Sequence, residues 1–167
     1  MFDTDLIAAA AELIAACKSG GKMIATAESC TGGLLAGLLT QLPGSSTVFE
    51  RGFVTYSNAA KSELLGVDEQ LIAAHGAVSA EVAQAMALGA LAHSRAQLAL
   101  AVTGIAGPGG GSEAKPVGLV YLACAVAGGT VAVREERYGD LGREAVRAAA
   151  LRTALGMLAQ KATPARS

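Results

Sequence analysis

Tryptophan is absent from this chain, aromatic residues are only 4% of it, and its charges nearly cancel. Apolar residues still make up 52% of the 167 residues, so we expect one domain with a sizeable core of Ala, Leu, Val and Ile. The formal net charge of −1 gives no electrostatic reason to expect nucleic acid or an anionic membrane as a partner. Any anion site must therefore be a local arrangement of basic side chains and backbone N–H groups.

Cysteine and histidine are also scarce. The three cysteines, Cys17, Cys30 and Cys124, lie far apart and form no CxxC pair, and the chain has only two histidines. A zinc site is therefore not expected, and we predict no metal or other cofactor. An odd number of scattered cysteines is typical of a reduced intracellular protein, which predicts a cytoplasmic location.

Long apolar runs are missing as well. No run approaches the roughly 18 residues that a membrane-spanning helix needs. Asp3 and Asp5 occupy the region where a signal peptide would carry basic residues. We therefore predict neither a membrane span nor a signal peptide.

Apolar periodicity predicts helices that alternate with strands. The expected helices cover residues 3–18, 31–41, 58–65, 68–76, 79–94 and 142–160. The expected strands cover residues 22–27, 47–56, 97–102, 117–127 and 130–138, the last two as a hairpin. This alternation predicts an α/β fold, a three-layer α/β/α domain with a mixed sheet. The single domain is expected over residues 6–160, with residues 161–167 as a frayed tail.

The stretch from Ala25 to Gly37 reads as strand, tight turn and helix. Ser29 lies where the strand ends, and Gly32 and Gly33 would let another molecule approach the main chain closely. A serine at this point has two interpretations. Either Ser29 or Thr31 caps the helix, or Ser29 is a nucleophile.

A glycine-rich loop runs from Thr103 to Ser112. Its spacing matches neither a Walker A loop nor the Rossmann GxGxxG pattern, so it is not identified as either phosphate loop. One interpretation is a flexible surface turn. The other is a binding loop, because it leaves the carboxyl end of an expected central strand, where ligands of open α/β sheets bind. Thr103 would stand at that edge with an exposed hydroxyl.

Tyr56 ends an expected strand, and Lys61 lies one turn into the following helix. Lys61 could be an ordinary solvated surface lysine. Alternatively, it could be the general base for a nucleophilic serine, a known variant of serine hydrolase chemistry. For that role Lys61 must lose its charge, which burial or a nearby cation could bring about.

Six segments together resemble one family. In order along the chain they read TAESCTGG, FERGFVTYSNAAK, LLGV, HGAVSAEVAQAMALGA, TGIAGPGGGSEAKPVGLVY and REAVR. They are similar to the CinA C-terminal domain family, and the resemblance covers residues 6–160. It implies hydrolysis of the carboxamide of nicotinamide mononucleotide to nicotinate mononucleotide and ammonia, the reaction of the family's stand-alone members. It also implies a homo-oligomer and a small-molecule partner.

The resemblance implies roles for individual residues. Ser29 corresponds to the nucleophile and Lys61 to its base, while Tyr56 and Thr103 resemble the family's supporting polar residues. The expected substrate-binding residues of the two turns are Cys30, Thr31, Gly32, Gly33, Gly104 and Gly107. Backbone N–H groups of the first four are candidates to stabilise an oxyanion.

Two departures from the family's pattern concern loops on the ligand side. Gly109 stands where the family often carries Asp, and residues 139–143 replace a compact Gly-Asp-Arg. Both changes bear on substrate affinity more than on chemistry.

Arg143 and Arg147 lie four residues apart at the start of the last expected helix, so they share a face. A cation in the first turn is mildly disfavoured by the helix dipole. Either Arg143 pairs with Asp140 or Glu144 on the surface, or the arginines hold the 5′-phosphate of the substrate.

Two other functions remain open at this stage: a nucleotide-binding or regulatory module without activity, and an amidase for another small carboxamide. The presence of Ser29, Lys61, Tyr56 and Thr103 together favours an active enzyme.

Overall fold

The computed structural model describes residues 2–162 of the chain. Its elements, in chain order, are α1 (Thr4–Ser19), β1 (Ile24–Glu28), α2 (Leu34–Thr40), a short 3-10 helix η1 (Ser45–Thr47), β2 (Phe49–Val54), α3 (Asn58–Leu65), α4 (Glu69–His75), α5 (Ala80–Ala92), β3 (Leu98–Gly104), β4 (Leu119–Val126), β5 (Val131–Arg137) and α6 (Arg143–Ala162). No helix in this part of the chain combines the length and the apolarity that crossing a membrane would require.

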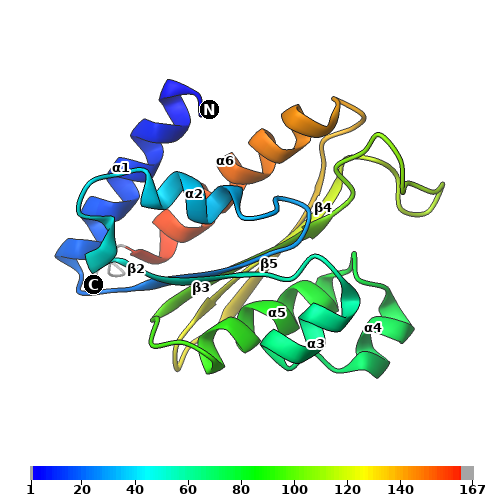
Figure 1. Cartoon of the computed structure of the whole chain (residues 1–167), viewed down its shortest axis with the longest axis horizontal. Helices are drawn as coiled ribbons and strands as arrows, with labels where there is room; N and C mark the ends of the chain where they lie inside the picture. The colour runs from blue at the N-terminus through cyan, green and yellow to red at the C-terminus, as the bar shows by residue number, and fades with distance from the viewer. Residues whose placement is uncertain (1, 163–167) are drawn as a thin grey trace.

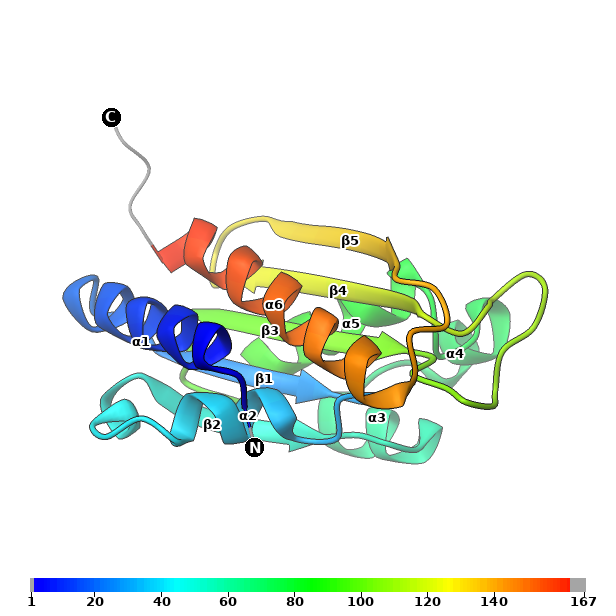
Figure 2. The same ribbon diagram turned by 90° about the horizontal axis from the view of Figure 1, so that it is seen from above.

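The five strands form one mixed sheet in the order β2-β1-β3-β4-β5. β1 pairs in parallel with β2 and β3, whereas β4 pairs antiparallel with β3 and with β5. Helices α1, α2 and α6 cover one face, and α3, α4 and α5 cover the other (Figures 1 and 2). The predicted single α/β domain of three layers with a mixed sheet is thereby confirmed.

Two apolar clusters fill the spaces on either side of the sheet, because neighbouring residues of a strand face opposite layers. In β1, Ile24 belongs to the cluster under α1, α2 and α6, while Ala25 and Ala27 belong to the cluster under α3, α4 and α5. β3 is buried along its length up to Thr103, as its continuous apolar run predicts for a central strand. Small alanines on the second face let α5 approach the sheet closely.

The structure departs from the sequence prediction at the start of α2 and at the end of α6. Helix α2 begins at Leu34 rather than near residue 31, with Gly33 as its N-cap residue. Helix α6 continues through Lys161 to Ala162, and Ala162 is buried in the core, so the prediction of a frayed tail is wrong for these two residues. The rest of that predicted tail, residues 163–167, lies outside the described residues.

The order of the strands determines where the site lies. The chain passes from β1 to β2 through α2 on one face, and from β2 to β3 through α3, α4 and α5 on the other. At such a reversal the helices diverge and leave a crevice beyond the carboxyl ends of the strands. The glycine-rich loop after β3 extends from this same edge (Figures 1 and 2).

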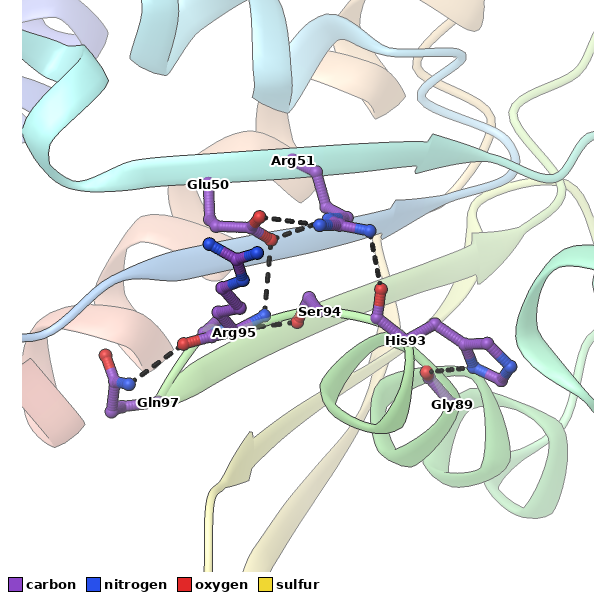
Figure 3. Close-up of polar contacts among 8 residues, drawn as sticks. Glu50, Arg51, Gly89, His93, Ser94, Arg95 and Gln97 are labelled. Carbon is purple, nitrogen blue, oxygen red and sulfur yellow. Dashed lines mark hydrogen bonds and ion pairs between the residues drawn. The ribbon is translucent and has the colours of Figure 1, made fainter.

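At the opposite end of the sheet, polar contacts join edge strand β2 to the connection between α5 and β3 (Figure 3). Arg51 donates to the Glu50 carboxylate at 2.6 Å and to the carbonyl of His93 at 2.8 Å. The His93 ring in turn contacts the Gly89 carbonyl at 2.8 Å. These contacts fix the C-terminal end of α5, where Gly89 lies closely against the end of α3.

Two helical glycines give a matched test of this packing. A Cβ at Gly89 would collide with the Leu65 carbonyl, whereas one at Gly156 would meet no atom within 4 Å. Gly156→Ala should therefore stabilise the protein by about 0.5–1 kcal/mol through helix propensity alone. Gly89→Ala should destabilise it by about 1–3 kcal/mol despite the same gain. Urea unfolding measures both, and equal effects would contradict the close α3–α5 contact.

Candidate active site

The carboxyl ends of the three parallel strands bring the predicted catalytic residues together. Ser29 follows β1, Tyr56 follows β2, Thr103 lies near the end of β3, and Lys61 reaches the same place from the first turn of α3. All four line one pocket of about 280 Å³. The pocket is also lined by Cys30, Asn58, Ala77, Val78, Gly104, Ile105, Ala106, Gly107, Gly109, Gly110 and Arg143.

Lys61 is not a surface lysine, because only 1% of it is exposed. Its Nζ lies 3.1 Å from Ser29 Oγ, 2.8 Å from the carbonyl oxygen of Thr55 and 3.5 Å from that of Ser57. Burial lowers the pKa of Lys61 from its usual range. No carboxylate of the described residues forms an ion pair with it. This environment favours a neutral amine beside the serine hydroxyl.

The backbone of the turn fixes the direction of Ser29. Its N–H donates to the Val102 carbonyl at 2.9 Å, which extends the pairing of β1 with β3 by one residue. Its carbonyl accepts from the Gly32 N–H at 3.0 Å. The Ser29 carbonyl and the Cys30 N–H belong to one trans peptide, in which the two groups point in opposite directions. Because the carbonyl points into the turn, toward Gly32, the Cys30 N–H points away from it. That N–H donates to no other residue among those described, and Cys30 lines the pocket.

The helix-cap interpretation of this turn is wrong for both hydroxyls. Ser29 caps no helix, and the buried Thr31 hydroxyl has no hydrogen-bond partner among the described residues. The side chain that serves α2 is Glu28, which accepts from the N–H groups of Gly33, Leu35 and Ala36. Sequence reasoning missed Glu28 because it stands before the turn, outside the usual N-cap position.

Thr103 lies at the predicted edge, but its hydroxyl is not exposed. The residue is 1% exposed, and its Oγ1 donates to the Ala77 carbonyl at 2.8 Å. Ala77 precedes α5, so this bond fixes one wall of the pocket. Lys115, which no sequence motif identified, donates to the carbonyls of His75 and Val78 in the same connection. Thr103 thus ties the start of the glycine-rich loop to that wall, and Lys115 ties the segment just after the loop to it.

The glycine-rich loop borders the pocket, which supports the binding-loop interpretation over a free surface turn. A Cβ at Gly104 would collide with Val120 and with the Leu119 carbonyl, so close backbone packing requires glycine there. Gly107 adopts a φ of 86° and lies against Val117. Gly109, by contrast, has open space around it, so its difference from the family's Asp strains nothing.

Tyr56 and Arg143 meet at the mouth of the pocket. Tyr56 is 59% exposed, and its hydroxyl oxygen accepts from the Arg143 guanidinium at 2.7 Å. Arg143 also donates to the Gly107 carbonyl at 3.0 Å. Among the described residues Tyr56 makes no hydrogen bond to Lys61, whose partners are Ser29, Thr55 and Ser57. Nor does Arg143 form an ion pair with Asp140 or Glu144 there.

Arg147 lies beside the pocket rather than in it. Its Nε donates to the Cys30 carbonyl at 2.8 Å, and its guanidinium borders a larger groove of about 950 Å³ between α1 and α6. Both predicted arginines therefore project from one face of α6 toward the site. Arg143 contacts the mouth of the pocket, whereas Arg147 contacts the turn that follows β1 through the Cys30 carbonyl.

The Cys30 thiol, although next to Ser29, is a poor nucleophile. It is buried, and burial raises its pKa to about 11. The reactive thiolate is therefore scarce near neutral pH. Within residues 2–162 no group of three or more His, Cys, Asp or Glu side chains is placed to hold a metal ion.

Replacing Lys61 by methionine tests the burial of the amine. Below the lowered folded-state pKa, both folded and unfolded chains carry the proton, and the folded state bears the full penalty of a buried charge. As pH rises through that pKa, the folded chain loses the proton while the unfolded chain keeps it, so the wild type gains stability. Lys61→Met should thus be more stable than wild type by roughly 1–4 kcal/mol at the acid end, and the difference should shrink with pH. Urea unfolding across the neutral to alkaline range measures it, and a constant difference would contradict a lowered pKa.

Comparison with known proteins identifies the family of this chain. Residues 7–162 match the family described as CinA C-terminal domain. A nicotinamide-nucleotide amidohydrolase, PncC, of Escherichia coli K12 is 49% identical over 162 residues, which cover 96% of this chain and 97% of that protein. The crystal structure of the competence/damage inducible protein CihA from Agrobacterium tumefaciens has a TM-score of 0.93 and 54% identity, covering 95% and 96% of the two chains. That of ComA from Klebsiella pneumoniae has a TM-score of 0.89 and 36% identity, covering 93% and 96%. The chain belongs to the CinA C-terminal domain family.

Proposed function

We propose that this protein hydrolyses the carboxamide of nicotinamide mononucleotide to nicotinate mononucleotide and ammonia, through an acyl-enzyme on Ser29. The observation that carries the proposal is the 3.1 Å approach of the buried Lys61 Nζ to Ser29 Oγ. The choice of substrate rests on the E. coli relative, which is named as a nicotinamide-nucleotide amidohydrolase. The reaction would serve pyridine nucleotide salvage, in a cytoplasmic homo-oligomer.

Lys61 acts as the general base. A neutral amine has two N–H bonds and one lone pair. The carbonyls of Thr55 and Ser57 accept the two N–H bonds, which leaves the lone pair directed at the Ser29 hydroxyl. Lys61 takes the Ser29 proton as Oγ adds to the carboxamide carbon. It then passes that proton to the departing ammonia, and water releases nicotinate mononucleotide from Ser29.

The developing oxyanion needs N–H donors that are not already engaged. Of the four candidates predicted from the sequence, Gly32 donates to the Ser29 carbonyl and Gly33 to Glu28. The Cys30 N–H has no such acceptor among the described residues and belongs to a residue that lines the pocket, so we assign it the oxyanion. The Ala106 and Gly107 N–H groups are likewise without acceptors in residues 2–162, and both residues line the pocket, so they are further candidates.

Arg143 holds the phosphate end of the substrate. It stands at the pocket mouth, and its present partners are a neutral hydroxyl and a carbonyl, not a carboxylate. Its charge is therefore not cancelled by an ion pair and is available for a phosphate. Arg147 is held by the Cys30 carbonyl and contributes its charge from one turn further along α6.

A binding module without activity fits the site less well. Burying a lysine without a carboxylate opposes folding, and a module that only binds nucleotide gains nothing from placing that lysine on a serine hydroxyl. A different small carboxamide remains the main competitor as substrate, and the phosphate-dependent test below separates the two.

The first test is ammonia release. Wild-type protein should release ammonia from nicotinamide mononucleotide, and Ser29→Ala should lower kcat by on the order of 10⁴-fold or more while keeping the fold. With hydroxylamine present, the acyl-enzyme should transfer its acyl group to give the nicotinic hydroxamate of the ribotide. Substantial turnover by Ser29→Ala would disprove the nucleophile assignment.

The second test concerns the phosphate. Arg143→Ala should raise KM for nicotinamide mononucleotide about 10–100-fold, as expected for the loss of a hydrogen bond to a charged group. KM for nicotinamide riboside, which lacks the phosphate, should change far less. Arg152→Ala is the control, because Arg152 lies on the same helix but pairs with Asp3. Equal losses on both substrates would mean that Arg143 supports the fold and that the phosphate binds elsewhere.

A further inference from the structure

Glu28 is a fully buried carboxylate in the residue just before the nucleophile. Its Oε2 accepts from the N–H groups of Gly33 at 3.2 Å and Leu35 at 3.0 Å, and its Oε1 accepts from that of Ala36 at 2.8 Å. No basic side chain of the described residues forms an ion pair with it. Its charge is therefore balanced by backbone N–H groups at the start of α2.

The three bonds span the turn that carries Ser29. They join the last residue of β1 to residues five to eight positions further along the chain. Two further N–H groups are engaged within the turn, that of Gly32 with the Ser29 carbonyl and that of Leu34 with the Thr31 carbonyl. From Cys30 to Ala36, the N–H groups of Cys30 and Thr31 alone have no acceptor among the described residues.

Helix α2 is thus not the source of oxyanion stabilisation. It has only seven residues, and the N–H groups of Leu35 and Ala36 in its first turn point at Glu28 instead of at the pocket. The carboxylate lies on the α2 side of the sheet, because Glu28 shares the face of Ile24 in β1. From the α6 side, Arg147 holds the Cys30 carbonyl. The turn is therefore held by two side chains of opposite charge: Glu28 accepts from backbone N–H groups, and Arg147 donates to a backbone carbonyl.

We propose that Glu28 is a positioning residue for the reaction: it fixes the turn so that Ser29 Oγ meets Lys61 Nζ and the Cys30 N–H faces the substrate carbonyl. This inference rests on the proposed function, in which Ser29 is the nucleophile. Glu28 does not touch the substrate pocket. Its effect should therefore appear in the chemical step and not in substrate binding.

The carboxylate is specifically required. Three N–H donors need two oxygens that both accept, which glutamate provides and glutamine does not. In Glu28→Gln the side-chain NH₂ must point at one of the three backbone N–H groups, so that two donors face each other without an acceptor. Glu28→Asp keeps the charge, but the aspartate side chain is shorter by one methylene group, so its carboxylate does not reach the N–H groups of α2 as that of Glu28 does.

The kinetic experiment compares Glu28→Gln with Ile24→Val, a conservative change at the other end of the same strand and on the same face. Glu28→Gln should lower kcat for nicotinamide mononucleotide about 10–100-fold, as for the loss of oriented groups in the transition state. Its affinity for the mononucleotide, measured by calorimetry in the Ser29→Ala background, should stay within about threefold. Ile24→Val should change neither. A parallel loss of kcat and affinity would overturn the positioning role in favour of general destabilisation.

A second measurement does not depend on the substrate. Amide hydrogen exchange by NMR should be at least about tenfold faster at Gly33, Leu35 and Ala36 in Glu28→Gln, and unchanged in the helix α5 amides. Wild-type exchange rates at these three amides would overturn the inference. If the mononucleotide were the wrong substrate, the wild type would release no ammonia, which distinguishes that failure from this one. Should Glu28→Gln not fold, Glu28→Asp carries both measurements with the same expected directions.

Discussion

The burial of the Lys61 amine against Ser29, without a carboxylate, is the constraint on which the site depends. A buried amine needs acceptors for its N–H bonds, and here they are backbone carbonyls of the segment between β2 and α3. Ser57 makes two of the contacts that hold this segment: its side chain accepts from the Ala60 N–H and so caps α3, and its carbonyl accepts from Lys61. Helix α3 then ends in a left-handed Gly66. The short helix is therefore fixed at both ends, which holds Lys61 in one place.

Much of the fold could be predicted because its signals are local. Ser57, Asp68 and Ser79 all accept a hydrogen bond from the first turn of the helix that follows, and the three predicted helices begin within two residues of them. The apolar run of β3 and the Gly128-Gly129 turn likewise identified the central strand and the hairpin. The carboxyl ends of parallel strands meet at one edge, so the convergence of Ser29 and Lys61 follows from the strand order.

The parts of the site that could not be predicted depend on partners distant in the chain. The direction of the Thr103 hydroxyl is set by the Ala77 carbonyl, which lies 26 residues earlier in the chain. Lys115 donates to the carbonyls of His75 and Val78, which lie 40 and 37 residues earlier. Tyr56 and Arg143 are 87 residues apart. No periodicity or turn rule specifies such pairs, because their geometry arises only when β3, the glycine-rich loop and α6 are packed together.

The sheet itself separates the two ionisable groups that flank Ser29, the Glu28 carboxylate and the Lys61 amine. Glu28 faces the layer of α2, whereas Lys61 enters from α3 in the opposite layer, and the turn lies at the edge where the layers meet. This separation matters because a carboxylate beside the amine would favour its protonated form and remove the base. Glu28 is not among the groups that shift the pKa of Lys61, which burial dominates. The Glu28 carboxylate instead accepts hydrogen bonds from three backbone N–H groups, so the turn gains a rigid anchor without a carboxylate near the amine. A chain with almost no net charge can in this way keep a neutral lysine, a buried carboxylate and an unpaired arginine within one small site.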